Sequence, residues 1–97
     1  MQNNIIDIIP TGERNAIKAW EIMNLLNYGD IREVAQDIAS LRKSGTIICS
    51  SKSGYFLPEK PSDVERFCRR TERRITEMQR ALQSASEYMQ ELKGSRG

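Results

Sequence analysis

The sequence predicts a mainly helical fold that contains one small β-hairpin and ends in a long C-terminal helix. Three observations support this fold class. Apolar residues recur at helical spacing in two stretches of the first half of the chain. Two short runs with β-branched and aromatic residues follow them, separated by a turn rich in serine and glycine. The last third has no glycine or proline between residues 62 and 93.

The two helical stretches are separated by a short turn. Residues 17–26 form the first predicted helix, because apolar residues recur at i, i+3, i+4 and i+7: Ala19, Ile22, Met23 and Leu26. The second begins at Asp30, with Glu33 completing a capping box, and its predicted buried face is Ile31, Val34, Ala35, Ile38 and Leu41. Two helices joined by a turn of three or four residues are typical of a helix-turn-helix.

A predicted hairpin follows directly after the second helix. Its strands are residues 46–49 and 55–57, and such a hairpin in this position is a wing. We therefore expect a winged helix-turn-helix domain at 1–58, a linker at 59–61, a helix at 62–93 opened by a Ser62–Glu65 capping box, and a frayed tail at 94–97. The predicted core is Ile22, Leu26, Val34, Ile38, Leu41, Ile48 and Phe56.

The composition argues against catalysis. Of the 97 residues, 38% are apolar and 29% charged, as in ordinary soluble domains, and none is histidine. Without histidine the chain has no Ser-His or Cys-His nucleophile and no zinc site with histidine ligands. We expect no enzyme activity, no metal and no cofactor.

The two cysteines and the hydropathy indicate an intracellular protein. Cys49 and Cys68 lie among apolar neighbours and are expected to be buried thiols, not a disulfide framework. No run approaches the roughly 18 apolar residues of a membrane span, and no leader segment is evident. A cytoplasmic location without membrane association is therefore expected.

Several motifs, taken in order, resemble a known family. They are Asn15-Ala16-Ile17, Leu25-Leu26, Arg32-Glu33-Val34, Leu41-Arg42-Lys43-Ser44-Gly45, Ile48-Cys49-Ser50 and Gly54-Tyr55-Phe56-Leu57-Pro58. Together they resemble the small winged helix-turn-helix proteins encoded by phages and prophages of Gram-positive bacteria. The resemblance implies DNA binding inside a bacterial host cell.

The resemblance also bears on segments that periodicity leaves open. Residues 5–9 fit a strand or a short helix equally well, and the resemblance favours a helix. It implies that residues 16–17 form a small strand beside the wing. The sequence departs from the family at Lys18, Ala35 and Asp37, and the last two make the second helix less basic.

The second predicted helix carries the candidate DNA-binding residues. Arginine and glutamine suit base edges in the major groove, and lysine suits phosphates. The candidates are Arg32, Gln36, Ser40 and Lys43 on this helix and Lys52 in the wing. The alternative is an ordinary solvated face, which Glu33 and Asp37 favour.

The long helix carries an unbroken heptad pattern, which predicts a homodimeric coiled coil. The predicted dimer seam is Val64, Cys68, Thr71, Ile75, Met78, Leu82, Ala85, Met89 and Leu92. The alternative is a helix that folds back across its own domain.

The opposite face of this helix is basic. Arg66, Arg69, Arg70 and Arg73 can grip phosphates or an acidic partner, and the alternative is a solvated face with salt bridges inside the helix. Trp20, the single tryptophan, is expected to be a half-buried packing residue, with a binding anchor as the alternative.

Two functions follow from these features. The first is sequence-specific binding of double-stranded DNA by a dimeric regulator of transcription or replication. The second is a phage effector that binds and inhibits a host protein, for example a bacterial defence or anti-CRISPR-type inhibitor. Residues 1–58 hold six basic and six acidic side chains, and this neutrality favours the second function.

Overall fold

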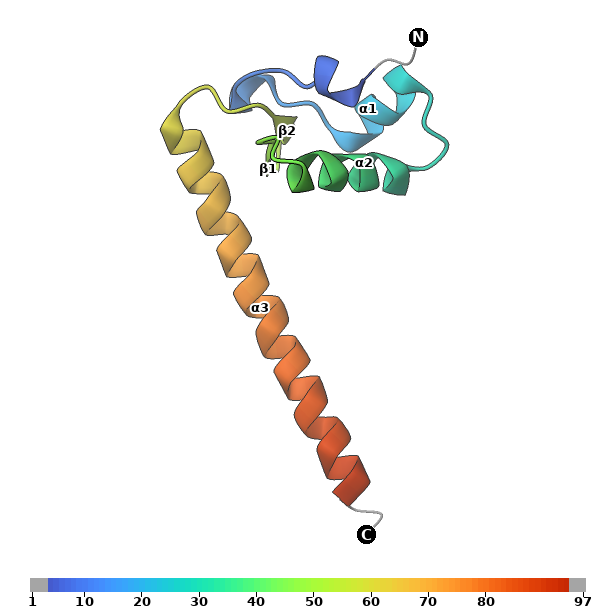
Figure 1. The fold of residues 1–97 in the computed structure, drawn as a ribbon, viewed down its shortest axis with the longest axis vertical. Helices are drawn as coiled ribbons and strands as arrows, with labels where there is room; N and C mark the ends of the chain where they lie inside the picture. The colour runs from blue at the N-terminus through green and yellow to red at the C-terminus, as the bar shows by residue number, and fades with distance from the viewer. Residues whose placement is uncertain (1–3, 95–97) are drawn as a thin grey trace. The chain divides into compact units, whose positions relative to one another are not determined.

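The computed structural model describes residues 4–94. The elements, in chain order, are η1 (Ile5–Asp7), η2 (Glu13–Asn15), α1 (Ala19–Leu26), α2 (Ile31–Lys43), β1 (Cys49–Ser51), β2 (Gly54–Phe56) and α3 (Pro61–Gly94) (Figure 1). The chain divides into two compact units, residues 1–67 and residues 68–97, and α3 contributes to both. The prediction of a mainly helical fold with one hairpin and a long C-terminal helix is confirmed.

The first apolar segment forms one 3-10 turn, η1. The N–H of Ile8 donates to the carbonyl of Ile5, which closes the turn, and Ile5 and Ile9 are buried. The segment is thus helical, as the resemblance implied, but it is shorter than a full α-helix. Pro10 follows directly and lacks the N–H that a continuing helix needs.

Helix α1 begins two residues later than predicted, because Ile17 belongs to the sheet. Ile17 and Tyr55 form an isolated antiparallel bridge, so the small strand expected at residues 16–17 is present only as a single bridge at Ile17. Lys18 is the N-cap residue, and its backbone N–H donates to the Glu21 carboxylate at 3.0 Å. A lysine side chain cannot accept a hydrogen bond, so only this half of a capping box forms. Asn27, in the left-handed conformation, ends the helix as expected.

Helix α2 is capped by Asp30, whose carboxylate accepts from the backbone N–H of Arg32 at 2.9 Å. Val34 and Ile38 are buried and Leu41 is half-buried. The prediction that Ile31 and Ala35 line the buried face is wrong, since both are exposed. Helix α1, with only eight residues, covers a narrow stripe of α2, and these two residues lie outside it.

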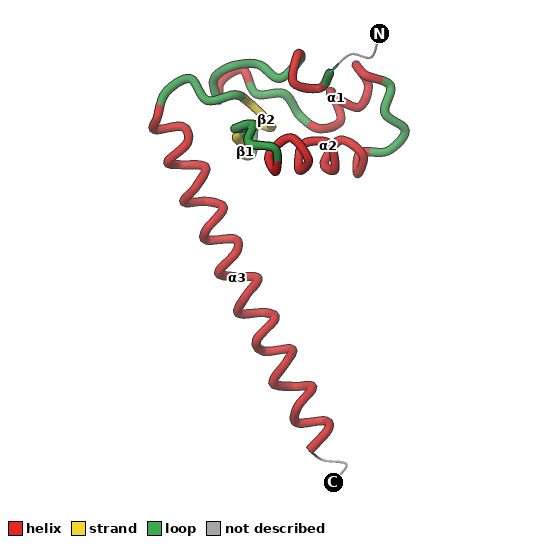
Figure 2. The backbone as a smooth tube through the Cα atoms, in the orientation of Figure 1, coloured by secondary structure: helices red, strands yellow, loops and turns green. Residues whose placement is uncertain are grey.

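The hairpin is shorter than predicted and begins later. Cys49 pairs with Phe56 and Ser51 with Gly54, and a two-residue turn at residues 52–53 joins the strands. Residues 46–48, predicted as strand, precede β1 without a strand partner. Figure 2 shows the two short strands in yellow beside one end of α2.

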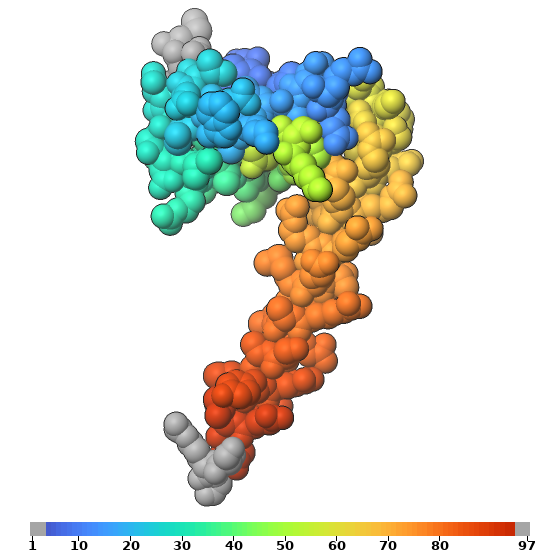
Figure 3. Space-filling view, turned by 180° about the vertical axis from the view of Figure 1, so that it is seen from behind, coloured from blue at the N-terminus to red at the C-terminus, as the bar shows by residue number. Residues whose placement is uncertain are grey.

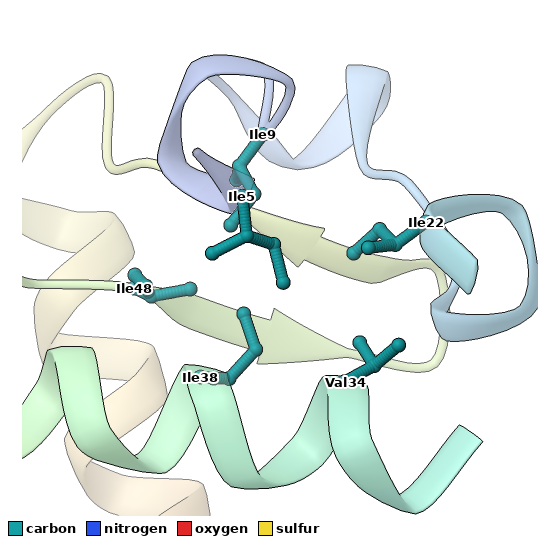
Figure 4. Packing of buried hydrophobic residues seen from close by; sticks show 6 residues of the cluster. All are labelled: Ile5, Ile9, Ile22, Val34, Ile38 and Ile48. Atoms are coloured by element: carbon teal, nitrogen blue, oxygen red, sulfur yellow. The ribbon is translucent and has the colours of Figure 1, made fainter. Parts of the chain in front are cut away.

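The core of residues 4–67 is small and mostly isoleucine. Side chains from η1, α1, α2 and the segment before β1 converge on it, as Figure 4 shows for Ile5, Ile9, Ile22, Val34, Ile38 and Ile48. The predicted core residues Ile22, Val34, Ile38, Ile48 and Phe56 are buried. Leu26 and Leu41, also predicted, are half-buried and pack against the edge of the cluster. One face of α2 therefore packs against the core, and the opposite face is exposed to solvent.

The start of α3 differs from the prediction. The helix begins at Pro61, and the side chain that closes its first turn belongs to Asp63, not to Ser62. The Asp63 carboxylate accepts from the backbone N–H groups of Glu59 at 2.9 Å and Lys60 at 3.2 Å. Proline suits the first helical position because its missing N–H would have no helical partner there.

The rest of α3 is exposed from Glu72 to Gly94. Gly94 is still helical, whereas residues 95–97 of the predicted tail lie outside the described residues. Cys49 is buried as expected, but the same prediction for Cys68 is wrong, because this thiol is exposed. No helix within residues 4–94 combines the length and the apolar character that a membrane crossing requires.

Candidate nucleic-acid interface

The outward face of α2 carries one polar stripe. Arg32, Gln36, Ala39 and Lys43 follow each other at i, i+4, i+7 and i+11, so their side chains lie along one line of the helix. All four are exposed. Ser40, also a candidate, is exposed beside this line. The structure therefore brings the four candidates of α2 onto one accessible surface.

Arg32 lies in the first turn of this stripe. Its backbone N–H is held by Asp30, and its guanidinium Nε is 3.9 Å from the Asp30 carboxylate. The Arg32 side chain is nevertheless 85% exposed. An exposed ion pair of this length contributes little, so the guanidinium can exchange Asp30 for another partner at small cost.

One of the two acidic residues of α2 is engaged within the fold. The Tyr28 hydroxyl donates a hydrogen bond to the Asp37 carboxylate. Burial of the ring, and then this bond to Asp37, raises the pKa of Tyr28 to about 12. The tyrosine therefore stays protonated and keeps donating at neutral pH. Asp37 is therefore held by a residue of the turn between the helices, and Glu33 is the other acidic residue of α2.

Two lysines, not one, lie at the hairpin turn. Lys52 is exposed in the turn, and the Lys18 ammonium donates to the Lys52 carbonyl at 3.5 Å. In Figure 3 the hairpin turn, in yellow-green, emerges at the surface beside the blue segment that precedes α1. Lys18 is a candidate site residue that the sequence alone did not reveal. No local motif relates it to Lys52, and only the Ile17–Tyr55 bridge brings them together.

Arg42 connects α2 to the hairpin. Its Nε donates to the Ile48 carbonyl at 2.9 Å, and its Nη2 donates to the Ser50 hydroxyl at 3.3 Å. The guanidinium also lies 4.9 Å from the centre of the Phe67 ring and 5.9 Å from that of Tyr55, within cation–π range. Arg42 therefore fixes the hairpin relative to α2, a role that the sequence alone did not reveal.

The four arginines of the predicted basic stripe of α3 differ in their burial and belong to both units. Arg66 is half-buried and forms ion pairs with Asp63 at 2.6 Å and with Glu13 at 3.5 Å. Its charge is therefore already compensated inside the first unit. Arg69 and Arg73, in the second unit, are exposed, and Arg70 is half-buried.

Trp20 does not pack as expected. Its side chain is 54% exposed and is not among those that pack against the core. The prediction of a half-buried packing residue is therefore wrong. Ile22, two positions later, is fully buried, and residues two apart on a helix point in very different directions.

An open hollow of about 690 Å³ lies beside the turn between α1 and α2. Its lining is Asn4, Ile5, Leu25, Leu26, Asn27, Tyr28, Asp37, Ser40 and Leu41. The two groups in it that titrate, Tyr28 and Asp37, are bonded to each other. The hollow is therefore lined by both polar and apolar residues, and the raised pKa keeps its tyrosine protonated. Among residues 4–94, no three histidine, cysteine, aspartate or glutamate side chains gather where they can hold a metal ion.

Comparison of the chain with protein-family models, with curated proteins and with solved structures finds no match.

Proposed function

We propose that this chain is a sequence-specific double-stranded DNA-binding protein of the winged helix-turn-helix type, and a binding protein, not an enzyme. The observation that carries the proposal is the exposed polar stripe of α2 in the same compact unit as the two lysines of the hairpin turn. In this account α2 enters the major groove and the hairpin turn follows the phosphate backbone.

The chemistry of α2 suits the major groove. A helix of 13 residues is about 20 Å long, and the major groove, about 12 Å wide, admits such a helix. Arg32, in the first turn, forks onto the O6 and N7 acceptors of guanine, and Gln36, one turn later, pairs with adenine. Ala39 has no long side chain to hold the helix away from the bases.

The hairpin turn supplies contacts that do not depend on sequence. The ammonium groups of Lys18 and Lys52 neutralise phosphates and set the position of α2, while Lys43 does the same at the end of the helix. Arg42 maintains the spacing between α2 and the hairpin, so the base-reading and phosphate-binding groups keep one geometry.

In this proposal the protein acts as a homodimer in the cytoplasm of a bacterial host. The resemblance of the sequence motifs to those of phage and prophage proteins supports a role in transcription or replication. Dimers of helix-turn-helix proteins read two half-sites about one helical turn apart, which links the assembly to the specificity.

The test is a binding assay with duplexes selected from a random library. Arg32→Ala should weaken binding to the selected site by about 1–3 kcal/mol and relax the preference at one base pair. Lys52→Ala should weaken binding to all duplexes about equally. Lys60→Ala, which removes an exposed lysine in front of α3, is the charge-matched control and should have little effect. Selection without enrichment, or equal effects of all three variants, would contradict the proposal.

The exposure of Trp20 favours a second candidate function, the inhibition of a host protein. An exposed tryptophan is costly to keep in water and is a frequent anchor of protein interfaces. In that case duplex binding is weak and blind to sequence, and alanines in α2 leave it unchanged. Trp20→Ala, or substitution of Arg69, Arg70 and Arg73, would then abolish binding of the host protein instead.

A further inference from the structure

The second unit is a single helix segment, and it presents an apolar stripe that no other described part of that unit covers. Ile75, Met78, Leu82, Met89 and Leu92 are between 46% and 68% exposed, and Ala85 lies on the same heptad line. Cys68, at the start of this line, is also exposed. Apolar residues with heptad spacing pack against the same residues of a second helix. The residues beside the stripe indicate whether the two helices run parallel or antiparallel.

The charges of this helix are distributed unequally along its length. Residues 68–80 hold five arginines and two glutamates, whereas residues 81–94 hold two glutamates and one lysine. A parallel pair would place the two arginine-rich halves side by side, where like charges repel. An antiparallel pair places each arginine-rich half beside the acidic half of the partner.

The sizes of the seam residues lead to the same orientation. In a parallel, in-register pair each residue meets its own copy, so Ala85 would meet alanine and leave a void, and Thr71 would meet threonine. In an antiparallel pair with Cys68 opposite the partner's Leu92, small residues meet large ones. Ala85 then lies opposite the partner's Ile75, and Thr71 lies opposite the partner's Met89.

The residues that flank the seam fit the same register. In the antiparallel pair Glu65 lies near the partner's Lys93, and Arg74 lies near the partner's Tyr88, on which a guanidinium can stack. The corresponding flanking positions of the parallel pair bring together no residues of opposite charge.

We propose that residues 68–92 of two copies of this chain pair as an antiparallel coiled coil, with Cys68 opposite the partner's Leu92. This inference rests on the homodimer of the proposed function and does not depend on DNA binding. The pairing buries each exposed apolar residue of the stripe against one of complementary size. It also places the arginine-rich half of each helix beside the partner's half that has a slight negative charge.

The test uses the native Cys68 thiol, since Cys49 is buried. Light scattering at tens of micromolar first establishes the mass of the full-length chain. Three proteins are then oxidised with a copper catalyst over a range of concentrations: the wild type, Leu92→Cys, and the double variant Cys68→Ser with Leu92→Cys. Each is compared on a non-reducing gel, and light scattering of the two variants under reducing conditions verifies that they keep the mass of a dimer.

The antiparallel pair predicts a rapid, concentration-independent disulfide dimer for Leu92→Cys alone. In the wild type and in the double variant the two like thiols lie about 36 Å apart, for 24 residues of helix at about 1.5 Å each, and stay unlinked within the dimer. Rapid linkage of the wild type and of the double variant would show a parallel pair and overturn the orientation. A dimer in which Leu92→Cys fails to link would overturn the register, and a monomeric wild type would overturn the pairing altogether. None of these results depends on whether the protein binds a duplex.

Discussion

Ile17 and Tyr55 exchange both of their backbone hydrogen bonds, with the Ile17 N–H donating at 2.9 Å and the Tyr55 N–H at 2.7 Å. This pair joins the segment in front of α1 to the second strand of the hairpin. It ends the extended segment just before α1 and places Lys18 at the hairpin turn. The geometry of the candidate phosphate contacts therefore depends on a backbone bridge and not on any side-chain motif.

Gly54→Ala should disrupt this bridge. Gly54 has φ +126°, and a Cβ there would lie 2.3 Å from the Ile17 carbonyl oxygen. The backbone of Ile17 would have to move, because both the conformation and the contact are unfavourable for alanine. We expect the free energy of unfolding to fall by about 2–4 kcal/mol in urea titrations, from backbone strain and overpacking together.

Gly45→Ala is the matched control for this variant. Gly45 also has a positive φ, +102°, but an added Cβ would meet no atom within 4 Å. The free energy of unfolding of Gly45→Ala should fall only by the cost of placing alanine at a positive φ, about 1–2 kcal/mol. Equal losses for the two variants would show that the Ile17–Tyr55 bridge tolerates a side chain at Gly54.

The acid stability of the first unit should depend on Asp63. The backbone N–H of Glu59, and then that of Lys60 and the Arg66 guanidinium, hold the pKa of Asp63 below its usual value of about 3.8, although burial acts in the opposite direction. A lowered pKa means that the carboxylate stabilises the fold above pH 4 and that this contribution is lost as the pH falls through the lowered pKa.

Thermal unfolding from pH 2 to pH 7 measures this contribution. Asp63→Asn should unfold at a lower temperature than the wild type above pH 4, and the two curves should converge at the acid end. Glu65→Gln removes an exposed carboxylate from the same turn and should show a smaller difference. A constant difference between wild type and Asp63→Asn at all pH values would mean that the charge of Asp63 is not what stabilises the turn.

The sequence predicts what depends on local spacing. Val34 and Ile38 are buried because helical periodicity identifies the inward face of α2, and the outward face with Arg32 and Gln36 follows from the same periodicity. Lys18 and Arg42 were missed because their roles depend on residues that the fold brings close from other elements.

The start of α3 and the exposure of Trp20 also differ from the sequence-based predictions. Asp63 and not Ser62 closes the first turn of α3, because the helix begins at Pro61 and Ser62 is already its second residue. Trp20 is exposed because α1 is only eight residues long and buries just one of its faces. Neither outcome is encoded in the spacing of apolar residues.

Leu82→Asp should convert the proposed dimer into a monomer. The residue lies near the middle of the exposed stripe, and an unpaired carboxylate in a buried seam costs several kcal/mol. Gln83→Asp introduces the same charge one residue away, outside the seam, and should leave the dimer intact. Sedimentation equilibrium gives both masses, and circular dichroism checks that the first unit stays folded. A monomeric Gln83→Asp variant, or a dimeric Leu82→Asp variant, would show that the dimer does not form through the predicted seam.

The salt dependence of duplex binding measures how many phosphates α2 and the hairpin turn neutralise. If Lys18, Lys43 and Lys52 of each copy neutralise one phosphate apiece, a dimer contacts about six phosphates. The logarithm of the affinity for the selected duplex should then fall against the logarithm of the salt concentration with a slope of about −5. Replacing Lys18 by serine should reduce the slope by about two, one for each copy. A slope near zero, or a slope that the lysine substitution leaves unchanged, would contradict DNA binding through α2 and the hairpin turn.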